Sequence, residues 1–213
     1  MNSMRETLTE TNQNTQYIFA LRPELETRWR RYLGIKPNQK ELSSNHKSRL
    51  EFTRFFQSHL MNGLKLFHLS VTYKTYEDKT IFPALTDTFF INFYLKAFLP
   101  CLMRTHKYHL SKNRLNQPIC YAFLDEHESK PDLDHPEIKF SERLHHHAIV
   151  AVNTIYLEHM RGLCGENTIP CESRFTKKVM TTHIRECEAM TTLYASKCFA
   201  KYPDFLSFPD RLH

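Results

Sequence analysis

Hydrophobic residues recur at two spacings along this chain, one typical of helices and the other typical of strands. Helical spacing predicts helices over residues 24–33, 50–60, 86–99, 154–163 and 188–201. Apolar stretches rich in β-branched and aromatic residues predict strands over residues 64–73, 119–127, 143–152 and 178–187. Between the second and third strands, residues 128–142 are polar and contain Pro131 and Pro136, which indicates a loop.

The order of these elements from residue 64 onward predicts the fold class. It runs strand, helix, strand, strand, helix, strand, helix, and we expect the second and third strands to pair as an antiparallel hairpin. This order is typical of an α+β fold in which helices cover one face of a ferredoxin-like or RRM-like antiparallel sheet. We expect the strand over 143–152 to be central in this sheet and the last helix to pack near it.

Positive charge is concentrated near the N-terminus, and this divides the chain. Residues 21–54 hold nine Lys and Arg against four Glu, a balance of +5 in a chain whose net charge is +6. We therefore expect a flexible tail over residues 1–16, a basic helical lobe over 17–62 and a main domain over 63–213. A basic lobe suits a polyanion, because Lys and Arg gain by releasing the counterions of phosphates. The alternative is a solvated helix face.

Composition argues against several classes of protein. The chain has only 4 Gly in 213 residues, which leaves little room for the Gly-rich loop of a nucleotide-binding fold, so no nucleotide cofactor is expected. The apolar stretch over residues 89–99 is too short to span a bilayer, and the polar residues 1–15 contain no signal-peptide core. The 6 Cys form no close pair, which favours reduced thiols in the cytoplasm.

Three consecutive histidines, in a chain with 13 of them, are the main candidates for metal chemistry. They are His145, His146 and His147, in the strand over 143–152. Alternate side chains of a strand share a face, so we expect His145 and His147 to point one way and His146 the other. The second strand ends in Asp125 and Glu126, and we favour Asp125 as a third ligand, with Glu126 as the alternative. A polar patch without metal is the competing interpretation.

The last predicted helix contributes a tyrosine and two lysines. Tyr194 and Lys197 are three residues apart and share a helix face, and Lys201 is seven residues from Tyr194 and roughly aligned with it. A tyrosine beside an ammonium group suits attack on a phosphodiester, since the lysine stabilises charge on the phosphate or on the phenolate. The competing interpretation is a tyrosine at the edge of the core.

Together these segments resemble the HUH superfamily of single-strand endonucleases, and especially the rolling-circle replication initiator (Rep) proteins of small plasmids and phages. A family motif of the form F-L-T-L-T-F matches residues 67–73, Phe-His-Leu-Ser-Val-Thr-Tyr. The His-hydrophobic-His motif matches residues 145–147, where His146 replaces the usual hydrophobic residue, and the Tyr-x-x-Lys motif matches residues 194–197. Members with two tyrosines place them four apart. Cys198 stands at that position, so the chain is similar to single-tyrosine members.

The resemblance implies a metal-dependent enzyme that nicks and rejoins DNA to initiate rolling-circle replication. His145, His147 and Asp125 would hold Mg²⁺ or Mn²⁺, and Tyr194, assisted by Lys197, would attack phosphorus to give a 5′-phosphotyrosine and a free 3′-hydroxyl. The implied partners are single-stranded or hairpin origin DNA and the host helicase and polymerase, in the cytoplasm of a bacterium carrying the plasmid or phage. From charge rather than from the motifs, the residues that we expect to contact DNA are Arg28, Arg30, Arg31 and Lys201.

Two other interpretations use the same residues. A single-strand transposase or a relaxase of the same superfamily would apply the same chemistry to different DNA. A non-catalytic, RRM-like nucleic-acid binder would need neither metal nor tyrosine and would stack bases on exposed aromatic side chains of its sheet. The strand aromatics available for that role are Phe67, Tyr73, Tyr121 and Phe123.

Overall fold

The structure is a computed structural model that describes the chain around one β-sheet. The described residues are 31, 43–73, 83–107, 113, 116–126, 144–171, 176 and 178–209. The expected tail over residues 1–16, the helix predicted over 24–33 apart from Arg31, and the loop predicted over 128–142 lie outside them.

The described chain contains seven helical segments and six strands. The helical segments are α3 (Ser44–Met61), α4 (Pro83–Phe93), the π-helix η1 (Tyr94–Phe98), α5 (Leu99–Met103), the 3-10 helix η3 (Thr154–Tyr156), α7 (Leu157–Gly162) and α8 (Thr191–Ala195). The strands are β1 (Lys65–Tyr73), β2 (Ile119–Glu126), β3 (Leu144–Val152), β4 (Gly165–Glu166), β5 (Val179–Cys187) and β6 (Phe205–Phe208). The four predicted strands correspond to β1, β2, β3 and β5.

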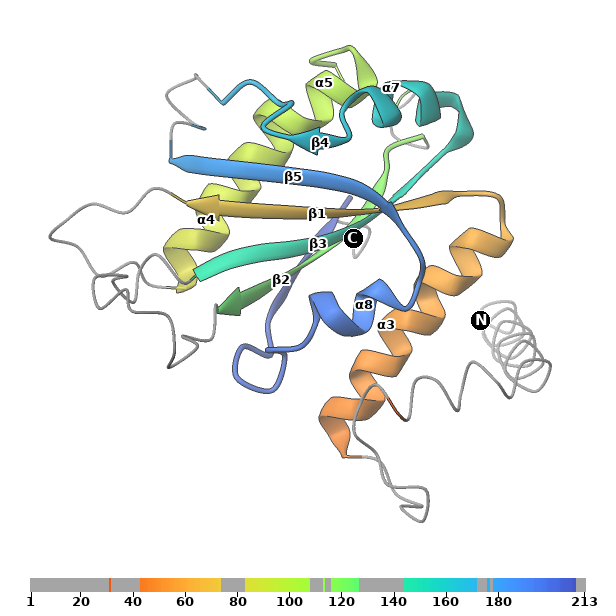
Figure 1. Cartoon of the computed structure of the whole chain (residues 1–213), viewed down its shortest axis with the longest axis vertical. Coiled ribbons are helices and arrows are strands. Elements are labelled where there is room, and N and C mark those ends of the chain that lie inside the picture. Colours follow the sequence, from red (N-terminus) through yellow and green to blue (C-terminus); the bar gives the residue numbers. More distant parts are fainter. Residues whose placement is uncertain are drawn as a thin grey trace, which may run out of the picture.

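The strands form one antiparallel sheet in the order β4-β5-β1-β3-β2-β6 (Figure 1). β1 lies between β5 and β3 and pairs with both. β2 and β3 pair with each other as antiparallel neighbours, as the sequence predicts. The histidine-rich strand β3 is therefore an inner strand, and all 9 of its residues are buried. The α+β class and the antiparallel sheet are confirmed.

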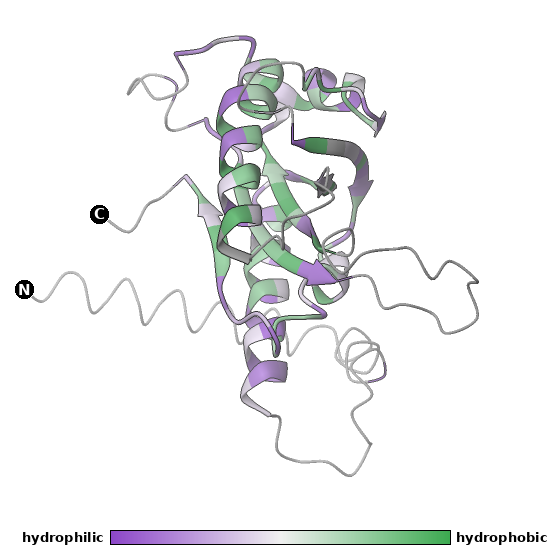
Figure 2. Ribbon diagram, turned by 90° about the vertical axis from the view of Figure 1, so that its left-hand side faces the viewer, coloured by the Kyte–Doolittle hydropathy of each residue, from purple (hydrophilic) through white to green (hydrophobic). Residues whose placement is uncertain are grey.

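One face of the sheet packs against α4, η1, α5 and α7. Alternate residues of β1, among them Phe67 and Leu69, join Phe90 and Phe93 of α4 and Met160 of α7 in the larger hydrophobic cluster. Figure 2 shows green, hydrophobic stretches along the central strands and on the helix beside them. This packing makes the inner strands a rigid base for side chains on the opposite face.

The opposite face of the sheet packs against α3 and α8. Leu66 of β1 and Ile149 of β3 lie in a second hydrophobic cluster with Phe56 of α3 and Ala195 of α8. Helices therefore cover both faces, and the one-sided arrangement expected from the sequence is wrong. The reason is that α3, expected within a basic lobe over 17–62, contributes its apolar side to the core of the sheet.

Two helices differ from their predicted form. The helix predicted to stop before Pro100 continues to Met103, and the π-helical turn over 94–98 precedes the proline. A widened turn accommodates a residue that has no backbone N–H to donate. The helix predicted over 188–201 ends at Ala195, because Lys197 N–H donates to Tyr194 O, three residues back, while Leu193 O accepts from Arg49 instead.

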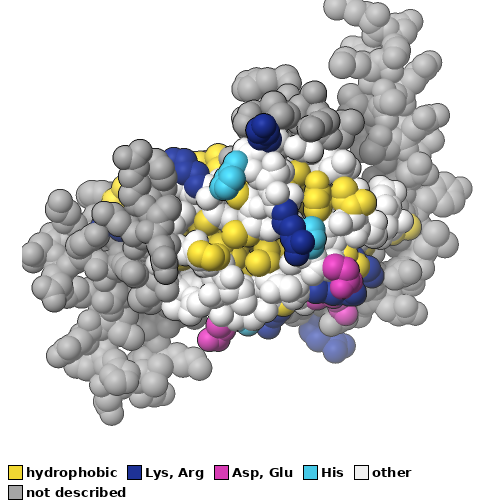
Figure 3. Space-filling model, turned by 90° about the horizontal axis from the view of Figure 1, so that it is seen from above, with side chains coloured by type: hydrophobic (Ala, Val, Ile, Leu, Met, Phe, Trp, Pro, Cys, Tyr) yellow, Lys and Arg dark blue, Asp and Glu magenta, His cyan; other side chains and the backbone are white. Residues whose placement is uncertain are grey.

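The surface seen from above Figure 1, at the end that carries α5 and α7, is chemically mixed. Figure 3 shows hydrophobic side chains there beside basic, acidic and histidine side chains. None of the helices in the described ranges combines the length and the apolar character that crossing a bilayer requires.

Candidate metal centre

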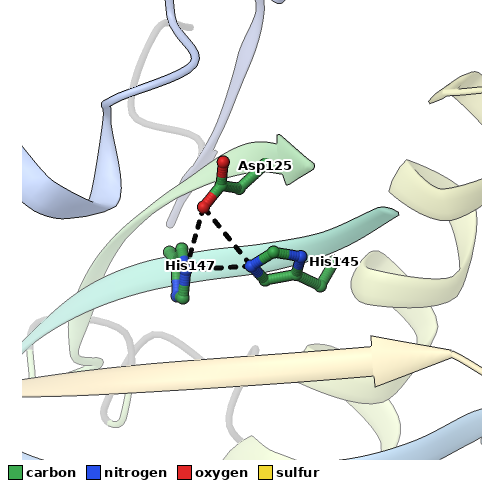
Figure 4. A group of neighbouring side chains, drawn as sticks. All are labelled: Asp125, His145 and His147. Carbon is green, nitrogen blue, oxygen red and sulfur yellow. Dashed lines mark hydrogen bonds and ion pairs between the residues drawn. The ribbon is translucent and has the colours of Figure 1, made fainter. Parts of the chain in front are cut away.

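Asp125, His145 and His147 converge on the face of the sheet that packs against α3 and α8 (Figure 4). The pairing of β2 with β3 sets Asp125 opposite His145, and strand alternation brings His147 to the same face. All three side chains are buried, with exposed fractions of 0%, 2% and 4% respectively. Figure 4 shows the carboxylate of Asp125 pointing toward both imidazole rings.

The three ligand atoms are close enough together to surround one ion. Asp125 Oδ2 lies 3.3 Å from His145 Nε2 and 3.0 Å from His147 Nε2, and the two nitrogens are 3.0 Å apart. Ligands about 2.1 Å from a cation and at right angles to each other are about 3.0 Å apart, so these separations suit octahedral coordination. Lys197 Nζ also lies 3.0 Å from Asp125 Oδ2, so this buried carboxylate oxygen faces an ammonium group as well as the two imidazoles. A bound cation would share the oxygen with that lysine.

Burial and charge give His147 and Asp125 the protonation states that metal binding requires. Burial lowers the pKa of His147 to about 4, and Asp125 only partly opposes this effect. Burial alone would raise the pKa of Asp125, but His145, His147 and Cys198 hold it well below its usual range. At neutral pH the His147 ring is therefore neutral and the carboxylate is charged, as metal ligands must be.

The donor set fits a divalent cation. Two imidazoles and one carboxylate accept several such ions, so the donor set alone does not choose among them. Within the described ranges this is the one group of three or more His, Cys, Asp or Glu side chains whose ligand atoms converge. The expectation of a divalent metal is therefore confirmed only to the extent that a buried cluster able to hold one exists.

The other side of the His147 ring has two partners on β1 that the motifs do not predict. His147 Nδ1 lies 2.9 Å from Ser70 Oγ and 3.0 Å from His68 Nε2. A histidine that binds metal through Nε2 carries its proton on Nδ1, and a neighbour that accepts this proton fixes the ring orientation. Burial lowers the pKa of His68 to about 3, so this ring is neutral and can accept. The sequence signal for this contact is a histidine within the largely apolar strand predicted over 64–73.

Tyr194 lies directly beside the cluster, on α8. Its ring centroid is 4.9 Å from that of His147 and 5.9 Å from that of His68. Lys197 Nζ lies 5.2 Å from the Tyr194 ring centroid and 3.0 Å from Asp125 Oδ2. Tyr194 is 37% exposed, so solvent reaches it although the adjacent ligands are buried. The structure thus brings the predicted tyrosine and Lys197 together with the predicted ligands.

The charge of Lys197 is maintained by the same carboxylate. Burial lowers the pKa of its ammonium group, but the hydrogen bond and charge of Asp125 outweigh this effect and raise the pKa above its usual value. Asp125 therefore faces both the two imidazoles and a cationic lysine. The positive charge of Lys197 therefore lies close to both the ligand cluster and Tyr194.

Glu126 and Lys201 pair with each other instead of joining the cluster. Glu126 accepts hydrogen bonds from Lys201 Nζ and, at 3.2 Å, from the Tyr202 hydroxyl. Neighbouring residues of a strand point to opposite faces, so Asp125 and not Glu126 meets the two histidines. The alternative third ligand is therefore engaged elsewhere, and the expected DNA contact Lys201 forms an ion pair within the protein.

His146 points into the packed layer on the opposite face of the sheet. Its Nδ1 lies 2.6 Å from the Tyr73 hydroxyl, and its Nε2 lies 2.9 Å from Asp87 Oδ1. The ring also contacts Phe90, with the ring centroids 4.9 Å apart. A histidine therefore occupies a core position here because two polar partners satisfy both of its ring nitrogens.

Of the remaining residues expected to contact DNA, Arg28 and Arg30 lie outside the described residues, and Arg31 is helical and exposed. All six cysteines are described and free, and Cys198 lies close enough to Asp125 to hydrogen bond to its carboxylate. Comparison of the chain with protein-family models, curated proteins and solved structures finds no match.

Proposed function

We propose that this chain is a DNA nicking-closing endonuclease of the HUH superfamily that initiates rolling-circle replication through a 5′-phosphotyrosine intermediate. The observation that carries the proposal is one juxtaposition. Asp125, His145 and His147 form a cluster that can hold a cation, and a solvent-accessible tyrosine, Tyr194, lies beside it. The ring centroids of Tyr194 and His147 are 4.9 Å apart. A nucleophile, a lysine and a cation site on one face of a rigid sheet are the parts that phosphoryl transfer needs.

Tyr194 acts as the nucleophile in this proposal. The phenol gives up its proton to solvent and its oxygen attacks the scissile phosphorus. The new P–O bond to tyrosine forms as the bond to the 3′-oxygen breaks, and the departing oxygen takes up a proton from solvent to become a 3′-hydroxyl. The phosphodiester energy is kept in the phosphotyrosine, so a later 3′-hydroxyl can reverse the step without ATP. A divalent cation, when bound, supplies polarisation of the phosphoryl oxygens.

Lys197 and the ligand residues assist through charge and position. The ammonium group of Lys197 lies over the Tyr194 ring and beside Asp125, where it stabilises negative charge on the phenolate or on the attacked phosphate. His145, His147 and Asp125 hold the cation beside the nucleophile, while Ser70 and His68 orient the His147 ring. Positioning of this kind accounts for most of the rate acceleration in phosphoryl transfer.

The arrangement of the long strands supports the ferredoxin-like part of the proposal. Their order is β5-β1-β3-β2, with α4 between β1 and β2 and α7 between β3 and β5. Both connecting helices contribute to one hydrophobic cluster, on the face opposite the metal centre. This is the β-α-β-β-α-β pattern, to which α3, α8, β4 and β6 are added.

The non-catalytic RRM-like alternative is disfavoured by the burial of its stacking residues. Phe67, Tyr73 and Phe123 are at most 2% exposed, and the Tyr121 ring is stacked on Phe55 at 4.9 Å. Rings packed in this way are not available to splayed bases. A transposase or a relaxase of the same superfamily remains the second candidate, because it would use the same centre.

The test is formation of a covalent adduct. The protein and Mn²⁺ are incubated with a library of single-stranded hairpin oligonucleotides labelled at the 3′-end, and adducts are separated on denaturing gels and mapped by mass spectrometry. We expect an adduct at Tyr194 that Tyr194→Phe abolishes. Tyr202→Phe, which changes a tyrosine on the same segment, is the matched control and should retain it.

Two further variants test the metal assignment. His145→Ala and His147→Ala should each abolish Mn²⁺-dependent nicking while DNA affinity stays within a few-fold. Nicking that persists in both would overturn the ligand assignment. DNA binding without any adduct, across the whole library, would instead favour the non-catalytic binder.

A further inference from the structure

Tyr194 is the exposed residue in a segment that is otherwise buried. Thr192, Leu193, Ala195 and Ser196 are completely buried, whereas Tyr194 is 37% exposed. The helix α8 is only five residues long, and an isolated helix of that length is not stable by itself. The placement of the Tyr194 side chain is therefore determined by contacts that hold its buried neighbours.

The polar contact that holds these neighbours comes from α3. Arg49 Nη2 donates to the Leu193 carbonyl, and Arg49 Nε donates to Ser196 Oγ at 3.4 Å. One guanidinium thus hydrogen bonds to the chain one residue before Tyr194 and two residues after it. Ser196 Oγ in turn donates to Thr192 O at 2.7 Å, and this bond connects Arg49, through Ser196, to the first turn of α8.

Burial of this guanidinium calls for an explanation other than stability. Arg49 is only 9% exposed, and removing a guanidinium from water is costly even when it is hydrogen bonded. A well-packed apolar residue of similar volume often gives equal or greater stability at such a position. An apolar residue, however, has no planar group of N–H donors, and such a group holds two hydrogen-bond acceptors in a fixed position relative to each other.

We infer that Arg49 is a positioning residue that fixes Tyr194 relative to the metal centre, through the Leu193 carbonyl and the Ser196 hydroxyl. The inference rests on the proposed role of Tyr194 for its consequence in nicking, but the control of α8 by Arg49 can be measured without it. In this arrangement α3 is part of the structure that presents the nucleophile, whereas the metal ligands are carried by β2 and β3.

The kinetic test compares three variants. Arg49→Met keeps the volume and Arg49→Lys keeps the charge, and neither keeps the planar group of donors, so both should lower kcat for nicking by about 10- to 100-fold, the effect of a displacement of about 1 Å. Mn²⁺ affinity and the KM for DNA should stay within about twofold. Lys47→Met removes an exposed positive charge from the same helix and should leave kcat unchanged.

The second measurement is hydrogen exchange of metal-free, DNA-free protein. In Arg49→Met we expect faster exchange in residues 191–197 and unchanged exchange in 144–152. Unchanged exchange in 191–197, or an equal rise in both segments, would overturn the inference, because α8 would then be held by other contacts or the whole fold would be weakened. The expected exchange pattern in a protein that never nicks DNA would uphold the inference about Arg49 and reject the proposed function.

Discussion

At the scale of single residues, the neutral rings of His147 and of its neighbour His68 connect metal binding to acid stability. The pKa of His147 is lowered to about 4 and that of His68 to about 3, while histidines in an unfolded chain have a pKa near 6.5. At pH values between the folded and unfolded pKa values, the unfolded chain binds more protons than the folded one. Stability should therefore be complete above about pH 6.5 and fall as the pH is lowered toward 4.

This linkage predicts a measurable loss of stability in mild acid. The free energy of unfolding of the metal-free protein should fall by on the order of 5 kcal/mol between pH 7 and pH 4.5, measured by urea unfolding. His147→Asn should reduce this pH dependence only in part, since His68 remains and the pKa of buried His146 is also lowered. An unchanged pH dependence in His147→Asn would contradict the assignment to His147.

The opposite face of β3 gives a second prediction at this scale. His146→Leu should cost about 1–3 kcal/mol of stability, because the buried Tyr73 hydroxyl would lose its partner. Adding Tyr73→Phe should recover part of that loss, since removing both partners of a buried hydrogen bond can be nearly neutral. Urea unfolding measures both effects. Because His146 faces away from the cluster, an Mn²⁺ affinity lowered by more than a few-fold would count against the separation of the two faces.

Strand alternation makes His145 and His147 predictable from sequence, but it does not decide between Asp125 and Glu126. That choice depends on the register between β2 and β3, which pairs Asp125 with His145 and which local sequence does not specify. His68 lies 79 residues from His147 and shows no spacing pattern with it. Its contact arises from the pairing of β1 with β3, a property of the assembled sheet.

At the scale of elements, β5 brings an arginine and a histidine to the same face as the metal centre. The register sets Arg185 opposite His68 and His183 opposite Ser70, so both share the face of His147. Arg185 is exposed and His183 is half-buried, and Thr181 continues the row beside Thr72, with their hydroxyls 2.5 Å apart. A polar strip along β5 and β1 therefore leads to Tyr194.

This strip predicts a DNA contact outside the basic lobe. Arg185→Ala should weaken single-stranded DNA binding and reduce the slope of log affinity against log salt by about 0.7, the loss of roughly one phosphate contact. Arg161→Ala is the control, since Arg161 is an exposed arginine on α7, which packs on the opposite face of the sheet. Equal effects of the two substitutions would show that only overall charge matters.

The elements that sequence predicts less well are those whose ends depend on distant contacts. The four long strands follow from their own composition. In contrast, α8 stops at Ala195, where the buried Ser196 bonds to Arg49, and β6 is too short to stand out but pairs with β2. The helix predicted over 50–60 begins earlier, at Ser44, because the Ser43 side chain caps it.

At the scale of the whole molecule, the expected boundary at residues 62 and 63 does not separate α3 from the sheet. Phe56 is completely buried against strand residues, and Phe52 contacts Phe123, Phe199 and Phe205 through its ring. A chain that begins at residue 63 should therefore fail to fold, since loss of one buried Phe alone costs about 3–5 kcal/mol. A chain that begins at residue 43 should still bind Mn²⁺. Circular dichroism and Mn²⁺ titration of the two truncations test this, and a folded 63–213 fragment would contradict it.

The basic lobe is tested by charge reversal. Replacing Arg28, Arg30 and Arg31 by Glu should weaken DNA binding and flatten its salt dependence, while Mn²⁺ affinity and adduct chemistry on saturating DNA persist. Binding measured between 50 and 200 mM salt, about the range over which phosphate contacts dominate, gives the slope. A slope equal to that of the unaltered chain would exclude these residues from the DNA interface.

The contact between Arg49 and α8 also has a consequence for how the protein is made. Its two ends, Arg49 and Leu193, are 144 residues apart, so one leaves the ribosome long before the other. Asp125, His145 and His147 are synthesised between them, and Tyr194 comes after all three ligands. A growing chain therefore acquires its metal ligands first, and it gains its tyrosine, and the contact that holds it to Arg49, only after all three ligands have been made.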